Sequence, residues 1–227
     1  MVLREIAQED ALEIFKNFSD PEITKWFFEE PYTQLTQVYE IIAKFNRDFL
    51  EMKGLTWGII LRENGEFIGT CGYDNLEISH HGEIGFDLSK EYWGKGFMTE
   101  ALSAIIDYGF EILDFARIEA DIFSNNLRAM RVLEKLSFQL DRVTNDLSYF
   151  SLSREAGQKI HPKGVQSRDG LTSRRRRPGM RRDLLCLLYD GGAGIAGGGE
   201  NPGTSAQSRG AARALIRHCE VRKPGHT

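Results

Sequence analysis

Cysteine is scarce in this chain, and long apolar runs are absent. The 227 residues include three cysteines, Cys71, Cys186 and Cys219, whose spacing fits neither a disulfide framework nor a metal site. No apolar stretch approaches the roughly 20 residues that a membrane-spanning helix needs. The opening MVLREIAQEDALEIF has neither the apolar core of a secretory leader nor the composition of a transit peptide. We therefore expect a soluble, cytoplasmic protein with no membrane attachment and no metal.

Acidic and basic residues are divided unequally along the chain. Residues 1–155 carry 15 Lys and Arg against 28 Asp and Glu, a net charge of −13, whereas residues 156–227 carry 14 against 5, a net charge of +9. The second part also holds 13 of the 23 glycines and has few aromatic residues and little apolar periodicity. Such a composition does not build a hydrophobic core. We expect a folded domain at 1–155 and a basic, Gly/Arg-rich, disordered tail at 156–227.

Apolar periodicity predicts an α+β domain in the first part. Strands are predicted at 2–6, 55–61, 66–73, 83–89, 117–123 and 146–153, and helices at 9–18, from Pro21, between Pro31 and Gly54, at 98–113 and at 125–136. The pair Asn64-Gly65 between two β-rich runs predicts a hairpin. Ser19 or Asp20 is expected to cap the second helix, and Ser124 or Asn125 to lie near the cap of the last. The alternation of strands and helices indicates a mixed sheet.

A glycine-containing turn stands between a predicted strand and a predicted helix. The stretch EYWGKGFMTEA places Gly94 and Gly96 directly before the helix. Unpaired N–H groups at a helix start form an anion site, and glycines allow close approach of a phosphate. The spacing matches neither a P-loop nor a dinucleotide fold, because Thr99 stands where the latter has its third glycine. Taken alone, the two glycines indicate only a tight turn.

The neighbouring motifs add a family resemblance. EIGFDLSKEYWGKGFMTEAL, with NLRAMRVLEKLSF at 126–138, resembles the GNAT N-acetyltransferase family, and within it the RimJ/RimL-type branch that acetylates protein N-terminal amines. The resemblance covers about residues 2–155. It implies a central mixed, mostly antiparallel twisted sheet flanked by helices, with acetyl-CoA in the splay between the two middle strands. It implies direct transfer of the acetyl group to an amine without a covalent enzyme intermediate.

The resemblance also implies which residues bind acetyl-CoA. The backbone of Phe86, Asp87 and Leu88 would pair with the pantetheine arm, and Asn126 would bond the same arm. The pyrophosphate would lie against Trp93, Gly94, Lys95, Gly96, Phe97, Met98 and Thr99.

The chain departs from the family pattern at several positions. Glu91 replaces a Gln or Arg, and Ala129 and Ser137 replace a Ser and a Gly. Leu133 stands where many relatives have the tyrosine that protonates the departing thiolate, and leucine cannot do so. The last hairpin is about ten residues shorter than is usual in the family. These departures leave open a degenerate protein that binds acetyl-CoA without turnover.

Candidates for the general base are Asp121, Glu83 and Glu119. Glu119 and Asp121 share one strand face by the two-residue period, and Asp121 matches a position where some N-terminal acetyltransferases carry a base. For each carboxylate taken singly, a solvated surface role is the alternative. Tyr149 is a lesser candidate for the acid. Backbone N–H groups near Phe86 are expected to stabilise the oxyanion.

The acceptor side offers the stretch KWFFEEPY. Glu29 and Glu30 are interpreted as an acidic rim that attracts a cationic acceptor, while Trp26, Phe27 and Phe28 are expected to serve packing first. A similar run in spermidine acetyltransferases keeps a polyamine acceptor open beside a protein N-terminus. The oligomeric state is also open, with a homodimer as one option. Nucleic-acid binding by the arginines at 174–177, 181 and 182 is disfavoured by the acidic domain beside them.

Overall fold

The computed structural model describes residues 1–27, 30–76 and 80–160. Its strands are β1 Val2–Glu5, β2 Leu55–Ile60, β3 Phe67–Asp74, β4 His81–Leu88, β5 Arg117–Phe123, β6 Gln139–Val143 and β7 Leu147–Ser153. Its α-helices are α1 Ala11–Phe18, α2 Pro21–Thr24, α3 Leu35–Leu50, α4 Phe97–Glu111, α5 Leu127–Lys135 and α6 Arg154–Ile160, with short 3-10 turns at Gln8–Asp10 (η1) and Lys90–Tyr92 (η2). The arginines at 174–182, Cys186 and Cys219 lie outside the described residues.

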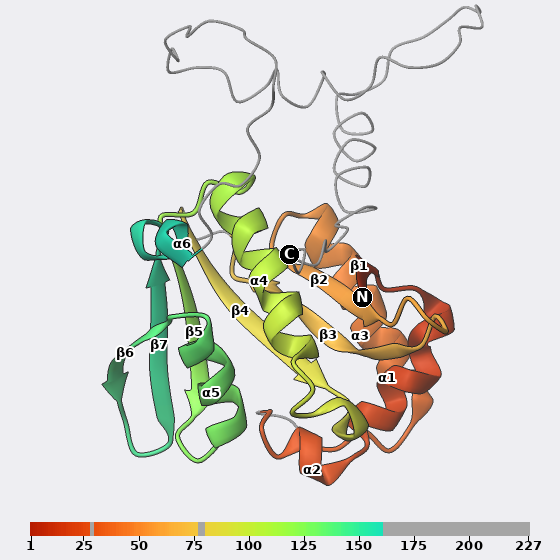
Figure 1. The fold of residues 1–227 in the computed structure, drawn as a ribbon. Helices are drawn as coiled ribbons and strands as arrows, with labels where there is room; N and C mark the ends of the chain where they lie inside the picture. The colour runs from red at the N-terminus through yellow and green to blue at the C-terminus, as the bar shows by residue number, and fades with distance from the viewer. Residues whose placement is uncertain (28–29, 77–79, 161–227) are drawn as a thin grey trace, which may run out of the picture. The chain divides into compact units, whose positions relative to one another are not determined.

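The strands form one seven-stranded sheet in the order β1-β2-β3-β4-β5-β7-β6. Every neighbouring pair in this sheet is antiparallel except β4 and β5, which run parallel. Helices α4 and α5 lie on one face of the sheet, and α1 and α3 lie on the other (Figure 1). The predicted α+β fold with a mixed, mostly antiparallel sheet is therefore confirmed.

The two faces of the sheet carry separate apolar cores. On one face, the Tyr73 hydroxyl donates to the carbonyl oxygen of Ile105 at 2.6 Å, which fixes β3 against α4. The buried side of α4 follows the helical period through Met98, Ala101, Leu102, Ile105, Ile106 and Phe110. On the opposite face, Ile14, Val38 and Ile42 of α1 and α3 pack against β2 and β3. Helix α4 covers the middle of the sheet, and α1 and α3 cover its first three strands.

Local signals explain several element boundaries. Gly65 adopts φ 73° in the turn between β2 and β3, as the predicted hairpin requires. Asp20 caps α2, since its carboxylate accepts the backbone N–H of Glu22 at 2.9 Å, and Pro21 opens the helix. The cap of α5 is Asn126 rather than Ser124 or Asn125, because its side-chain oxygen accepts the N–H of Ala129 at 3.2 Å.

Two elements were not among the predicted ones. Strand β6, exposed along its whole length, pairs with β7 and forms the sheet edge, so its sequence carries no apolar alternation. Helix α6 spans Arg154–Ile160, and the expected domain boundary after Glu155 therefore falls inside a helix.

Candidate functional site

The parallel strands β4 and β5 separate soon after they meet. They pair only at His81 with Arg117, Gly82 with Ile118 and Glu83 with Glu119. Beyond Glu83, the β4 backbone continues to Leu88 facing the gap between the two strands. Backbone N–H and C=O groups along such a gap can bond an extended ligand as they would bond a strand.

The glycine loop lies at the end of β4, directly before α4. Gly94 and Gly96 have φ of 73° and 88°, and Gly96 is the N-cap of the helix. A Cβ atom at either position would meet no atom within 4 Å, so the backbone conformation, rather than crowding within the chain, requires glycine here. The first-turn N–H groups of this 15-residue helix therefore begin at a left-handed turn, as in an anion site.

A pocket of about 530 Å³ joins the gap and the loop, and we call it the donor pocket. Its walls are Ile23, Trp26, Phe27, Phe86, Asp87, Leu88, Trp93, Gly94, Met98, Asn126, Arg128, Ala129, Arg131, Val132 and Lys135. Seven of the eleven residues expected to bind acetyl-CoA are among them. Lys95, Gly96, Phe97 and Thr99 are not among the lining residues, and Lys95 lies over the ring of Tyr92 at 5.2 Å.

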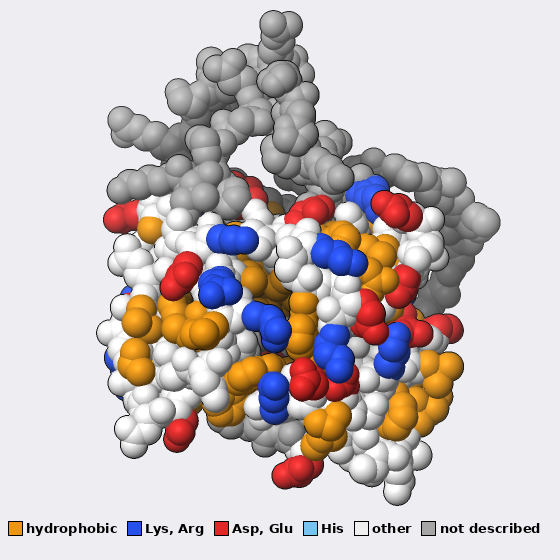
Figure 2. Space-filling view, turned by 60° about the horizontal axis from the view of Figure 1, so that its bottom comes forward, with side chains coloured by type: hydrophobic (Ala, Val, Ile, Leu, Met, Phe, Trp, Pro, Cys, Tyr) orange, Lys and Arg blue, Asp and Glu red, His pale blue; other side chains and the backbone are white. Residues whose placement is uncertain are grey.

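Three basic side chains in this wall were not among the site residues predicted from the sequence. Arg128, Arg131 and Lys135 project from α5 into the lining of the donor pocket, and the Arg128 guanidinium lies 4.5 Å from the ring centre of Trp93. Figure 2 shows Lys and Arg side chains gathered around a hollow that has hydrophobic side chains within it. The signal was present in NLRAMRVLEK, because positions three and four apart share a helix face. Such charge suits a phosphate-bearing ligand.

The three candidate bases lie together on the sheet face opposite α4. Glu83 is paired with Glu119, and Asp121 follows two residues later on the same strand. Glu83 accepts from the Asn75 side-chain amide at 2.6 Å, and Glu119 accepts from the Arg117 guanidinium at 2.7 Å. Partial desolvation, with Glu83 as the next cause, raises the pKa of Asp121 above its ordinary value. A raised pKa makes this carboxylate the stronger proton acceptor.

Leu133, which replaces the tyrosine expected to act as the acid, has no solvent-exposed surface and is buried in the core. Tyr149 lies elsewhere, on β7 directly across from Asp121, with the Arg142 guanidinium 3.8 Å from its ring centre. Its hydroxyl therefore belongs to the same face as the candidate bases.

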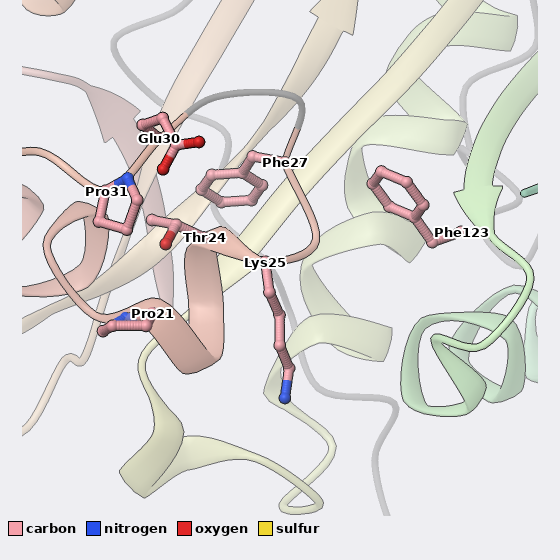
Figure 3. Close-up of a pocket in the computed structure, with 7 residues that line it drawn as sticks. All are labelled: Pro21, Thr24, Lys25, Phe27, Glu30, Pro31 and Phe123. Atoms are coloured by element: carbon pink, nitrogen blue, oxygen red, sulfur yellow. The ribbon is translucent and has the colours of Figure 1, made fainter.

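A second pocket of about 440 Å³ adjoins the donor pocket through Phe27, and we call it the acceptor pocket. Pro21, Thr24, Lys25, Phe27, Glu30, Pro31 and Phe123 line it. Figure 3 shows the Phe27 ring on the side of Glu30 and Pro31, with the Glu30 carboxylate beside it, while Lys25 extends away from Glu30 and Phe123 comes from β5 on the other side.

Of the two glutamates predicted to form an acidic rim, the structure describes Glu30. Glu30 is exposed and lines the acceptor pocket, whereas Glu29 and Phe28 lie outside the described residues. Trp26 and Phe27 are half-buried, and the Phe27 ring packs edge-on against Phe18 at 5.4 Å. The aromatic side chains thus serve packing and line pockets at once.

Membrane-spanning helices and metal-binding clusters are both absent from the residues that the structure describes. No helix within 1–27, 30–76 or 80–160 is long and apolar enough to cross a membrane. Within the same ranges, no group of three or more His, Cys, Asp or Glu side chains is placed to hold a metal ion.

Comparisons with known proteins agree on one family. Residues 1–139 match the family described as acetyltransferase (GNAT) domain. The uncharacterized N-acetyltransferase p20 of Bacillus licheniformis is 38% identical over 147 residues, which cover 64% of this chain and 83% of that protein. Spermidine N(1)-acetyltransferase of Escherichia coli (strain K12) is 26% identical over 142 residues, covering 61% of this chain and 73% of that protein. The solved structure of Mycobacterium smegmatis RimJ in complex with CoA-disulfide gives a TM-score of 0.62 at 19% identity, covering 70% of this chain and 87% of that one.

Proposed function

Because this chain belongs to the GNAT acetyltransferase family and is an acetyl-CoA-dependent acyltransferase, we propose that it acetylates a protein N-terminal α-amine. The main support for acetyl-CoA binding in this proposal is that β4 diverges from β5 beside the donor pocket. This pocket joins the glycine loop to α5. This arrangement offers strand-like backbone groups, a helix start and basic side chains to one long ligand.

Each part of the donor pocket suits one part of acetyl-CoA. The β4 backbone from Phe86 to Leu88 pairs with the pantetheine arm, and the loop from Trp93 to Thr99 holds the pyrophosphate through backbone N–H groups. Asn126 caps α5 with its oxygen, so its side-chain N–H₂ is the group that bonds the arm. The basic residues of α5 add positive charge for the phosphates.

The choice of an α-amine as the acceptor follows from the strength of the base that the site offers. A protein α-amine has a pKa near ~8, so about a tenth is neutral at pH 7, whereas a lysine amine near ~10.4 costs about 4–5 kcal/mol to deprotonate. Asp121 is exposed to solvent and is a modest base even with its raised pKa. A modest base suffices for an α-amine, and Glu30 in the acceptor pocket attracts its cationic form.

The transfer then needs few protein groups. Asp121 takes a proton from the attacking amine, directly or through a water. The amine nitrogen bonds the thioester carbon, and backbone N–H groups near Phe86 stabilise the resulting oxyanion. The carbon–sulfur bond breaks with its electron pair on sulfur, and the thiolate takes a proton from Tyr149 or from solvent. Glu83 and Glu119 keep the local potential negative for the cationic amine.

A polyamine is the second candidate acceptor. The observation that favours it is the grouping of Glu83, Glu119 and Asp121 on one open face of the sheet. The spermidine acetyltransferase relative supports the same alternative.

Product analysis by mass spectrometry separates the candidates. The full chain is incubated with acetyl-CoA and equal amounts of three acceptors: a lysine-free peptide with a free α-amine, an N-terminally blocked peptide containing lysine, and spermine. We expect acetylation of the free α-amine to predominate. Asp121→Asn should lower the rate about 100-fold, while the exposed Asp146→Asn should not change it.

The other results each decide against the proposal. Predominant acetylation of spermine would establish the polyamine alternative. Binding of acetyl-CoA in calorimetry without any acetylated product would indicate a degenerate donor-binding protein. Failure to bind acetyl-CoA would remove the donor assignment as well.

A further inference from the structure

A buried polar cluster connects three elements beneath the donor pocket. Asn17 of α1, Thr70 of β3 and Asp87 of β4 are exposed by only 2%, 6% and 7%. The Asn17 side-chain amide donates to one Asp87 carboxylate oxygen at 3.3 Å, and the Thr70 hydroxyl donates to the other. The backbone N–H of Thr70 also donates to this carboxylate. The cluster therefore joins residues 17, 70 and 87, which are far apart in sequence, through one side chain.

A buried carboxylate needs all of these donors. Removing an ion from water is unfavourable, and burial is the largest cause that raises the pKa of Asp87, while the hydrogen bonds from Thr70 and Asn17 lower it. Asn17 and Thr70 donate to different oxygens of Asp87, and an amide at position 87 would put an N–H₂ donor in place of one of these two acceptors. The link between α1 and β4 therefore depends on a carboxylate facing an amide.

The cluster adjoins the donor pocket through Asp87. Asp87 lines the donor pocket together with its β4 neighbours Phe86 and Leu88. Asn17 lies near the end of α1, and the chain continues from there to Trp26 and Phe27, which line the donor pocket from the other side. We call residues 11–27 the acceptor-side segment, because Phe27 also lines the acceptor pocket.

A second, exposed link joins the same parts of the chain. The Lys90 ammonium in η2 lies 2.7 Å from the Asp20 carboxylate that caps α2. An exposed ion pair of this kind adds little stability. The buried Asn17–Asp87 bond is thus the stronger connection between the acceptor-side segment and the end of β4.

We propose that Asp87 is a positioning residue, which fixes the acceptor-side segment to the donor strand so that a ligand in the donor pocket orders residues 11–27. The proposal rests on acetyl-CoA binding and does not depend on the identity of the acceptor. Occupation of the pocket holds β4 in place, and Asp87 passes this restraint to Asn17 and through α1 to Trp26 and Phe27. The wall of the acceptor pocket is then set when the donor is bound.

Hydrogen exchange followed by mass spectrometry tests this coupling without any acceptor. Exchange is measured on the full chain with and without acetyl-CoA, in the wild type, Asn17→Asp, Asp87→Asn and the double variant Asn17→Asp/Asp87→Asn. The double variant restores an amide facing a carboxylate with the two groups exchanged. Asp10→Asn is the matched control, since Asp10 is also a buried carboxylate, 5% exposed, but it bonds Arg4 and lines neither pocket.

The expected pattern separates coupling from simple loss of stability. In the wild type and in Asp10→Asn, acetyl-CoA should slow exchange about tenfold both in 93–101 and in 11–27. In each single variant the slowing should persist in 93–101 and disappear in 11–27, and the double variant should recover at least half of it.

Three results overturn the proposal, and each is distinct from failure of the proposed function. One is wild-type slowing in 93–101 but none in 11–27. Another is slowing of 11–27 that survives in both single variants. A third is a folded double variant that recovers nothing. If no region of the wild type is slowed, acetyl-CoA does not bind, and the donor assignment fails first.

Discussion

At the scale of single residues, the titration of Asp87 gives a stability test. Burial raises its pKa from 3.8 to about 6 in the folded chain. Because the folded state binds this proton more tightly than the unfolded chain, the ionised carboxylate destabilises the fold above about pH 6. That destabilisation is relieved as the pH falls from about 6 toward 3.8. Asp87 therefore favours the folded state most at low pH.

The prediction compares the wild type with Asp87→Asn. Other carboxylates titrate in both proteins and cancel in the difference. We expect the stability of the wild type relative to the variant to rise by about 2 kcal/mol between pH 7 and pH 4. Urea unfolding at several pH values measures it. A difference that stays constant with pH, or that falls as the pH is lowered, would show that Asp87 has no raised pKa.

Positions that line the donor pocket were predictable where the sequence is locally patterned. Gly94 and the β4 residues Phe86 to Leu88 lie close together in one short motif, and all of them line the pocket. Asn17 and Thr70 were not found, because nothing in the sequence near either indicates a partner on another element. Arg128, Arg131 and Lys135 share a helix face by their spacing, but the spacing alone does not indicate that this face lines a pocket.

At the scale of elements, a substitution in the glycine loop tests whether its backbone conformation is needed for binding of acetyl-CoA. Gly96→Ala places a side chain at φ 88°, which costs about 1–2 kcal/mol in the left-handed region. We expect weaker binding of acetyl-CoA by about tenfold, because relief of this strain moves the first N–H groups of α4. Isothermal titration calorimetry measures the dissociation constant.

The matched control is Gly65→Ala in the β2–β3 turn. Gly65 has φ 73°, and a Cβ atom added there, as at Gly96, would lie more than 4 Å from every other atom considered. The two variants should therefore lose similar stability, but only Gly96→Ala should lose affinity for acetyl-CoA. Equal affinities in the two variants would exclude the loop as a ligand site.

Elements with an apolar face were predictable from the sequence, and those without one were not. The long helices, the first five strands and β7 each bury a patterned side against the sheet or a helix. Strand β6 is held by backbone bonds to β7 and by polar side chains such as Asp141, which accepts from Ser151 at 3.1 Å. Backbone pairing of this kind leaves no periodic signal in the sequence.

At the scale of the whole molecule, α6 sets where the domain can be cut. Gly157 packs so closely on Phe110 of α4 that a Cβ atom there would lie 2.5 Å from the ring. A chain ending at residue 160 should bind acetyl-CoA as the full chain does. A chain ending at residue 155 uncovers part of Phe110, and we expect its melting temperature to be about 3–6 °C lower than that of the 160-residue chain.

Thermal unfolding of the two shortened chains and the full chain measures this. The 160-residue chain keeps Arg154 in its helix, where its guanidinium donates to the Phe115 carbonyl oxygen at 2.9 Å and to Asp114 at 2.8 Å. Loss of acetyl-CoA binding in the 160-residue chain would show that residues 161–227 belong to the working protein. Identical melting of the two shortened chains would show that α6 contributes nothing.

The short contact between β4 and β5 also has an architectural consequence. Strands β1 to β4 form one antiparallel half of the sheet, and β5, β7 and β6 form the other. In the described part of the chain, β4 and β5 pair at three residue positions, and just before them the Ala116 N–H donates to the His80 carbonyl oxygen at 2.8 Å. An extended ligand in the gap offers hydrogen-bonding groups to the β4 edge along the length where β5 has left it. In the binding mode that we propose, acetyl-CoA takes the place of a neighbouring strand beside β4 and leaves it again in each turnover.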